Sequence, residues 1–198
     1  MEQNPSYSNK KRLVIGMSGA SGAGLTIQLL QQMKACPGWE THLVISKGAQ
    51  MTIAQETDYT PSQVEAMADA AYDINDYGAK IASGTYRTEG MILLPCSMKT
   101  AAGISCGYSD NLLLRAADVT LKERRTLVLV PRESPFSTIH LRNMLTLAEA
   151  GAFIMPPVPP YYSKPSSLEE MNQQIIGKLL DRFQIPVPGF LRWGEEAE

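Results

Sequence analysis

The chain has 198 residues and a formal net charge of −2, from 18 Lys and Arg against 20 Asp and Glu. This length favours one domain that buries its core without disulfides or a structural metal. The weak acidity argues against nonspecific nucleic-acid binding, which needs a strongly basic surface. The uncharged apolar runs, such as residues 91–95, are too short to span a membrane. Three cysteines without a CxxC spacing and only two histidines argue against a metal site.

The N-terminal segment, residues 1–11, is polar and has no apolar core of the kind found in signal peptides. We therefore expect a flexible tail over residues 1–11 and a single α/β domain over residues 12–198. Without a signal peptide or a membrane span, the expected location is cytoplasmic.

Five short apolar runs, each followed by a segment with helical spacing, predict the strands of the core. The runs show no alternation of apolar and polar residues, which is typical of strands buried on both faces of a parallel sheet. They cover residues 13–15, 42–46, 91–94, 126–130 and 152–155.

Helices are predicted between these runs over residues 22–34, 61–71 and 138–150, and after them from residue 168. Thr60 and Thr138 are expected to cap two of these helices, and Ser167 begins a capping box. Alternating strands and helices predict right-handed βαβ units. The expected fold class is α/β, a three-layer doubly wound parallel sheet.

Ligands of such sheets bind beyond the carboxyl ends of the strands. Glycines, hydroxyl groups or charges follow four of the predicted strands. These segments are residues 16–22 (GMSGASG), Ser46, residues 95–100 (PCSMKT) and residues 131–133 (PRE). Together they indicate a ligand site at this edge of the sheet.

The loop at residues 16–22 joins a strand to a helix. Its glycines let the backbone approach a ligand, and the helix N-terminus offers N–H groups to a phosphate. The loop is neither a Walker A nor a dinucleotide GxGxxG motif, and a tight turn with capping serines is the alternative interpretation. Residues 19–23 come near a GxSxG nucleophile elbow, but only one strand precedes them, which argues against a serine hydrolase.

Two further strand exits allow both a chemical and a structural interpretation. Residues 97–100 offer donors to a phosphate or a heteroaromatic ring, or cap a helix. Arg132 and Glu133 can bind an anion and hold a proton-transfer group side by side, or form a surface ion pair.

The other conspicuous residues are open to structural interpretations as well. The charged run at 122–125 stabilises a helix C-terminus. The proline-rich segment at 156–162 either holds tyrosines in fixed positions or serves as a strut. Cys96 and His140 are interpreted as structural residues.

Seven motifs in chain order resemble those of the flavin prenyltransferases, the UbiX-like family that includes the B subunits of phenolic-acid decarboxylase systems. The resemblance runs from about residue 12 to residue 193, nearly the whole chain. The motifs are GMSGASG at 16–22, PCSMKT at 95–100, RAAD at 115–118, LKERR at 121–125, VPRE at 130–133, HL at 140–141 and the loop around Tyr162.

The resemblance implies a flavodoxin-like Rossmann fold and a homo-oligomer, typically a dodecamer, with FMN bound where subunits meet. It implies that a dimethylallyl phosphate alkylates reduced FMN at N5 and that a fourth ring then closes through C6, without a metal. The prenylated FMN would pass to a partner UbiD-type decarboxylase that acts on unsaturated or aromatic acids.

Carried over residue by residue, the resemblance implies a role for each expected site residue. FMN would be bound by Gly19, Ala20, Ser21, Ser46, Ser97, Met98, Lys99, Thr100, Arg115 and Arg132. The prenyl phosphate would be held by Tyr162, Lys178 and Lys122. The catalytic residues would be Ser21, Glu133 and Lys122, because fixed cations stabilise the leaving phosphate and a carboxylate can take the released proton.

Lys178 departs from the family pattern, which usually has an arginine at this position. Lysine keeps the charge but loses the bidentate fork, so the expected consequence is weaker affinity for the prenyl phosphate.

Two other functions stay open. A non-catalytic FMN carrier, or a subunit of a phenolic-acid decarboxylase complex, would keep the flavin loops without needing Glu133, Lys122 or Tyr162. A flavin-dependent decarboxylase of the same fold would use a histidine after the second strand, where this chain has SKG at residues 46–48.

Overall fold

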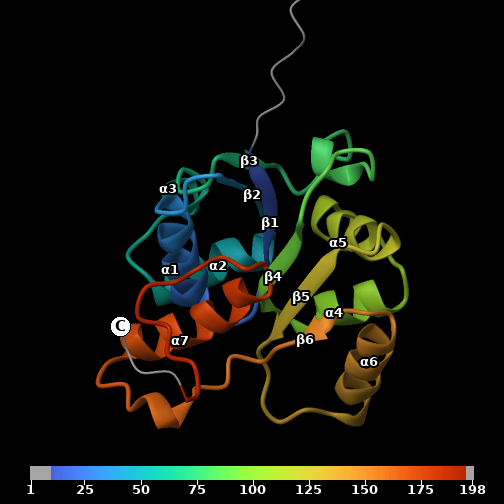
Figure 1. Ribbon diagram of the computed structural model, residues 1–198. Helices are drawn as coiled ribbons and strands as arrows, with labels where there is room; N and C mark the ends of the chain where they lie inside the picture. The colour runs from blue at the N-terminus through green and yellow to red at the C-terminus, as the bar shows by residue number, and fades with distance from the viewer. Residues whose placement is uncertain (1–9, 195–198) are drawn as a thin grey trace, which may run out of the picture.

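The computed structural model describes residues 10–194, and its centre is one parallel sheet (Figure 1). The strands of the described chain lie in the order β3-β2-β1-β4-β5-β6, so the order reverses between β1 and β4. Their bounds are β1 (Lys11–Met17), β2 (Trp39–Ile45), β3 (Ala70–Tyr72), β4 (Gly90–Cys96), β5 (Thr126–Pro131) and β6 (Phe153–Ile154).

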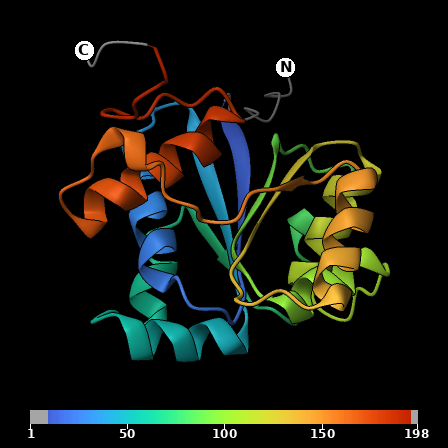
Figure 2. The ribbon, with the colours of Figure 1, turned by 90° about the horizontal axis from the view of Figure 1, so that it is seen from below.

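Helices cover both faces of this sheet, which confirms the predicted three-layer α/β class. Figures 1 and 2 show α1 and α7 on one face and α4, α5 and α6 on the other. The helices are α1 (Ala23–Lys34), α2 (Lys47–Glu56), α3 (Pro61–Glu65), α4 (Met98–Ser105), α5 (Leu112–Lys122), α6 (Thr138–Glu149) and α7 (Leu168–Asp181), with 3-10 turns η1 (Lys80–Ala82) and η2 (Tyr161–Ser163). No helix of residues 10–194 is both long and apolar enough to cross a membrane.

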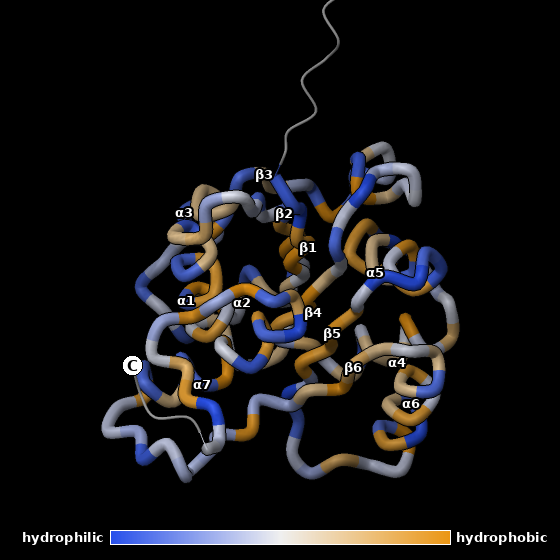
Figure 3. The backbone as a smooth tube through the Cα atoms, viewed as in Figure 1, coloured by the Kyte–Doolittle hydropathy of each residue, from blue (hydrophilic) through white to orange (hydrophobic). Residues whose placement is uncertain are grey.

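The central strands are continuously apolar in sequence because their side chains pack into two separate cores, one on each face of the sheet. In β1, Leu13 and Ile15 belong to the core under α1 and α7, while Val14 belongs to the core under α4 and α5. All seven residues of β4 are buried. Figure 3 shows the resulting apolar centre between polar outer surfaces.

The helix predicted over residues 61–71 is wrong in its second half. Thr60 caps α3 as expected, but the helix ends at Glu65 and Ala70–Tyr72 forms the edge strand β3. The carboxylate of Asp69 accepts hydrogen bonds from the backbone N–H and the hydroxyl of Thr41, which fixes the entry to β3 beside β2. This pairing with a strand distant in sequence overrides the local helical preference.

Three smaller boundaries also differ from expectation. The cap of α6 is Ser137 rather than Thr138, and its hydroxyl accepts from the His140 N–H (3.3 Å). Ser167 caps α7 as predicted, but the carboxylate of Glu170 accepts from Ser166 instead of closing the box. β1 already begins at Lys11, and the rest of the predicted tail, up to residue 9, lies outside the described residues.

Gly90, at the start of β4, can be replaced only at a large cost. Its φ is +155°, and a Cβ added there would lie 2.1 Å from the backbone oxygen of Thr126. We expect Gly90→Ala to lower the free energy of unfolding by about 2–4 kcal/mol. Gly24→Ala is the matched control, because nothing lies within 4 Å of its added Cβ in α1. That control should raise stability by roughly 0.5–1 kcal/mol. Urea unfolding of both variants checks this, and a Gly90→Ala protein as stable as the parent contradicts it.

Candidate functional site

The carboxyl ends of β1 and β4 meet where the strand order reverses, which is where doubly wound sheets bind ligands. Ser18, which is 1% exposed, joins the two ends. Its hydroxyl donates to the Pro95 carbonyl (2.9 Å) and accepts from the Ser97 N–H (2.7 Å). The two loops predicted to bind a ligand are therefore held side by side by a buried hydrogen-bond network.

A cavity of about 700 Å³ lies beside these loops. Its lining includes five of the predicted site residues, namely Gly19, Ser46, Ser97, Lys99 and Thr100. Gly19 lies directly against Gly48, since a Cβ on Gly19 would be 2.8 Å from the Gly48 Cα. The structure thus brings together the loops after β1, β2 and β4.

The hydroxyl groups at this cavity also cap helices, so the structural interpretation of the serines holds together with the chemical one. Ser46 accepts from the Ala49 N–H at the start of α2 (3.1 Å), and Ser97 accepts from the Thr100 N–H at the start of α4 (3.3 Å). Two helix N-termini, with their partial positive charge, therefore face the cavity next to the ammonium group of Lys99. This arrangement suits a phosphate ester. Met98 is buried in the core, so only its backbone is available to a ligand.

Glu56, at the end of α2, belongs to this site although it was not predicted from the sequence. One oxygen of its carboxylate, Oε2, accepts from the backbone N–H groups of Gly22 and Ala23, both at 2.9 Å. The first N–H groups of α1 therefore already hold an anion, so a phosphate does not occupy those two donors. Nothing local in the sequence signals this contact, because Glu56 lies 34 residues beyond Gly22.

Glu56 also links two predicted site residues. Partial burial raises the pKa of its carboxyl group, but the N–H groups of Gly22 and Ala23, the Ser21 hydroxyl and the Arg132 charge outweigh that effect, and the net pKa is lowered. The Ser21 hydroxyl and the Arg132 guanidinium thus both stabilise the Glu56 carboxylate at this edge of the sheet.

Glu56→Gln is expected to lower the free energy of unfolding at pH 7 by about 1 kcal/mol, because the exposed carboxylate is screened by solvent and glutamine still offers one acceptor oxygen. The lowered pKa means that the ionised group stabilises the fold above its unfolded-state pKa, and that this stability is lost as the pH falls through the folded pKa. The variant should therefore lose less stability than the parent below about pH 4.5. Urea unfolding between pH 3 and pH 7 measures both effects, with Glu65→Gln in α3 as the control, and parallel pH curves for variant and parent refute the assignment.

Arg132 and Glu133 follow β5 at the same carboxyl edge. The Arg132 N–H donates to the Cys96 carbonyl (3.2 Å), which places the exit of β5 against the exit of β4. The Glu133 carboxylate accepts from the Ser134 N–H (3.0 Å), and both side chains are exposed. No ion pair joins these two side chains to each other in the described structure, and the Arg132 charge acts on the Glu56 carboxylate instead.

Tyr162 and Lys178 line a second cavity, of about 190 Å³. This cavity lies between the proline-rich segment, α7 and the C-terminal segment, and most of its lining is apolar. Of its three polar lining residues, Tyr162 and Lys178 are exposed and Gln174 is buried, as are the apolar Ile175 and Leu179. The cavity therefore combines an apolar interior with a phenol and an ammonium group on its open side.

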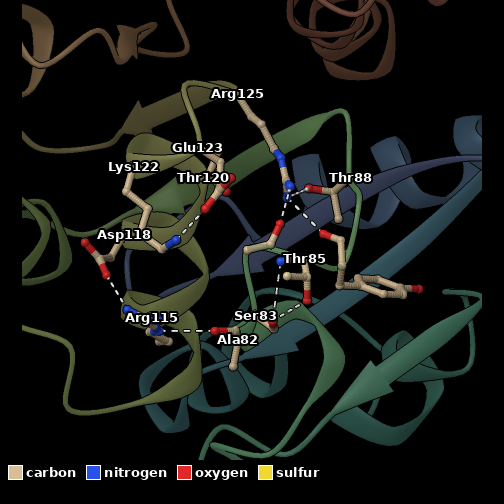
Figure 4. A network of polar contacts seen from close by, with 12 residues as sticks. Ala82, Ser83, Thr85, Thr88, Arg115, Asp118, Thr120, Lys122, Glu123 and Arg125 are labelled. Atoms are coloured by element: carbon tan, nitrogen blue, oxygen red, sulfur yellow. Dashed lines mark hydrogen bonds and ion pairs between the residues drawn. The ribbon is translucent and has the colours of Figure 1, made fainter.

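Arg115 and Lys122 lie at a third place, shown in Figure 4. Arg115 donates to the Ala82 carbonyl (3.2 Å) and to the Asp118 carboxylate (2.6 Å), and Lys122 pairs with Glu123. Lys122 ends α5 near the amino end of the sheet, and the seven residues of β4 separate it from the flavin loops by roughly 20 Å. Within one chain, the predicted site residues are therefore divided among three places.

The two residues interpreted as structural have the roles expected of them. Cys96 is fully buried, and burial raises the pKa of its thiol to about 12, so it is not a nucleophile at neutral pH. The Nδ1 atom of His140 accepts from the Ser137 N–H (3.2 Å) and completes the cap of α6. In the part of the chain that the structure describes, no three His, Cys, Asp or Glu side chains gather in a metal-binding arrangement.

Comparison with known proteins agrees with this architecture. A family model described as Flavoprotein matches residues 1–180. The flavin prenyltransferase UbiX of Salmonella typhimurium is 50% identical over 185 residues, which cover 92% of this chain and 98% of that protein.

Two solved structures are similar to nearly the whole chain. The crystal structure of AnUbiX in complex with FMN and dimethylallyl pyrophosphate has a TM-score of 0.91 and 51% identity, and the match covers 94% of this chain and 99% of that one. A dodecameric FMN-dependent UbiX-like decarboxylase from Escherichia coli O157:H7 has a TM-score of 0.90 and 49% identity, over 93% of this chain and all of that one (100%).

Proposed function

Because the chain belongs to the flavin prenyltransferase family that includes UbiX, we propose that it joins a dimethylallyl group to N5 and C6 of reduced FMN. The donor is a dimethylallyl phosphate, and the product is prenylated FMN. The observation that carries this proposal is the pair of cavities, one suited to a flavin phosphate and one suited to an apolar group with an anionic end.

The larger cavity is the proposed place of FMN. At about 700 Å³ it has the size of an ordinary cofactor site. The N-termini of α2 and α4, with Ser46, Ser97, Lys99 and Thr100, would hold the flavin phosphate. The backbone of residues 19–21 and the guanidinium of Arg132 would then adjoin the ring system.

The smaller cavity is the proposed place of the prenyl phosphate. The Tyr162 hydroxyl and the Lys178 ammonium would hold the phosphate, and the apolar lining would hold the five-carbon group. Breaking the allylic C–O bond leaves its electron pair on the phosphate, so cations that contact this phosphate lower the barrier.

Arg115 and Lys122 cannot join this site within their own chain, because α5 and α7 lie on opposite faces of the sheet (Figure 2). We propose that a neighbouring copy supplies both cations in a homo-oligomer, which is a dodecamer as in the Escherichia coli O157:H7 relative. An open hollow around Lys122 has a net positive charge. It is lined by three cations, Arg87, Lys122 and Arg125, and one carboxylate, Glu123.

Two protons must leave the flavin, one from N5 on alkylation and one from C6 on ring closure. Glu133 is an exposed carboxylate at the strand edge and is the proposed acceptor for one of them. Ser21, hydrogen-bonded to the Glu56 carboxylate, is the proposed path for the other. The departing phosphate can take up the proton from N5. Ring closure requires a proton on the double bond of the transferred group, which makes the carbon that bonds to C6 cationic, and the proton released from C6 balances this uptake. The prenylated FMN would then pass to a UbiD-type decarboxylase.

The proposal is tested by incubating the full-length protein anaerobically with reduced FMN and dimethylallyl monophosphate, or with the pyrophosphate, and measuring the mass of the flavin. A gain of one prenyl unit supports the transferase. Bound FMN of unchanged mass with both donors contradicts it, and points to a flavin carrier or to a flavin-dependent decarboxylase.

A further inference from the structure

The C-terminal segment, residues 186–193, forms one wall of the smaller cavity. The Phe190 side chain lines it together with Met155, Val158, Ile175 and Leu179. The segment then continues to Trp193, whose ring lies perpendicular to the Tyr162 ring (89°) at a centroid distance of 5.2 Å. Phe190 of this segment therefore lines the cavity, and Trp193 contacts Tyr162, another lining residue.

Phe190 is held against α7 at Gly177. A Cβ added to Gly177 would lie 2.4 Å from both Cγ and Cδ2 of the Phe190 ring, so the ring packs directly on the helix backbone. Gly177 is buried, so the partly exposed Phe190 ring packs on a buried part of α7 at the cavity wall.

The backbone on both sides of Phe190 is fixed by one buried side chain. Gln174, which is 6% exposed, donates from Nε2 to the Gly189 carbonyl (2.7 Å) and accepts at Oε1 from the Leu191 N–H (3.0 Å). Arg192 adds a further restraint, since its guanidinium lies over the Phe190 ring and pairs with Asp181 (2.5 Å). The ring cannot move away without breaking these contacts.

We propose that Phe190 determines substrate specificity by limiting the length of the prenyl group to five carbons. This inference rests on the proposed function. A cavity of about 150 Å³ lined by apolar side chains holds benzene, a six-carbon ring. The volume here, about 190 Å³, is only slightly larger, so it suits a five-carbon group, and a ten-carbon group would need the space that Phe190 occupies.

The test compares the affinities of dimethylallyl monophosphate and geranyl monophosphate for the FMN-loaded, full-length oligomer by calorimetry. The parent should prefer the five-carbon compound by at least about 10-fold, and Phe190→Ala should reduce that preference by about 10-fold or more, because hydrophobic pockets discriminate chain length to this extent. Phe190→Leu should fall between the two. An unchanged preference in a folded Phe190→Ala protein overturns the inference, and Phe190→Leu decides the question in the same way if the alanine variant does not fold.

Gln174 and Gln173 provide a matched pair. Both donate to the C-terminal segment, but Gln173 bonds to the Pro188 carbonyl and does not line the cavity. Gln174→Ala should relax the chain-length preference, whereas Gln173→Ala should keep it, and equal effects contradict the role of the Gln174 contact. Binding is measured apart from transfer, so a protein that binds the five-carbon phosphate without prenylating FMN contradicts the proposed function alone.

Discussion

Glu133→Gln is expected to lower the rate of FMN prenylation by at least about 100-fold, because positioned acid–base groups contribute roughly 10²- to 10⁴-fold. Glutamine keeps the size and the acceptor oxygen that receives the Ser134 N–H, so the exit of β5 keeps its shape. It removes only the ability to take a proton. Single-turnover prenylation, followed by the mass of the flavin, measures the effect.

FMN binding by Glu133→Gln should stay within about two-fold of the parent, since the flavin cavity is lined by other residues. Glu133→Asp, which restores a carboxylate on a shorter side chain, should recover part of the rate. Glu149→Gln at the end of α6 is the control for loss of an exposed carboxylate and should be fully active. A Glu133→Gln enzyme with the parental rate would refute the role of this residue in proton transfer.

Lys122→Ala and Lys178→Ala should each lower the prenylation rate by about 100-fold or more, since each removes a cation from the leaving phosphate. In a single chain these lysines lie on opposite faces of the sheet, on α5 and α7. They can act on one phosphate only when two different copies contribute them. Mixed oligomers of the two variants should therefore regain roughly a quarter of the parental activity, the fraction of sites that receive both lysines by chance.

The control for this complementation is a mixture of the parent with the double variant Lys122→Ala/Lys178→Ala. If the two lysines come from different copies, an equal mixture again retains roughly a quarter of the parental rate. If both come from the same chain, this mixture retains roughly half, and the two single variants show no recovery on mixing. The pair of mixing experiments therefore separates a site shared between copies from one built within a single chain.

The central strands were predictable from the sequence because their pattern is local. A strand covered on both faces must be apolar at every position, and the runs around Leu13, Met91 and Leu127 meet that condition without reference to any other part of the chain. The loops after β1, β2 and β4 could be identified for the same reason, since glycines and hydroxyl groups cluster directly after each of these apolar runs.

Glu56 and β3 show what local patterns leave out. The Glu56 carboxylate can accept hydrogen bonds from Gly22 and Ala23 only because α2 packs beside α1. The residues next to Glu56 in the sequence do not indicate this contact. The segment Ala70–Tyr72 has little strand propensity of its own. It forms a strand because it pairs with residues 42–44 at the edge of β2.

The sequence by itself determined the α/β class, the central strands, the ligand-binding edge and the family, because each depends on residue patterns within short segments. Only the tertiary structure decided that Glu56 occupies the start of α1, that Phe190 lines the smaller cavity, and that Lys122 and Lys178 belong to helices on opposite faces of the sheet. These facts depend on which surfaces pack together across long separations in sequence. The face of the sheet on which a helix packs decides which site its charged side chains can reach. Residue spacing within the sequence does not indicate that face.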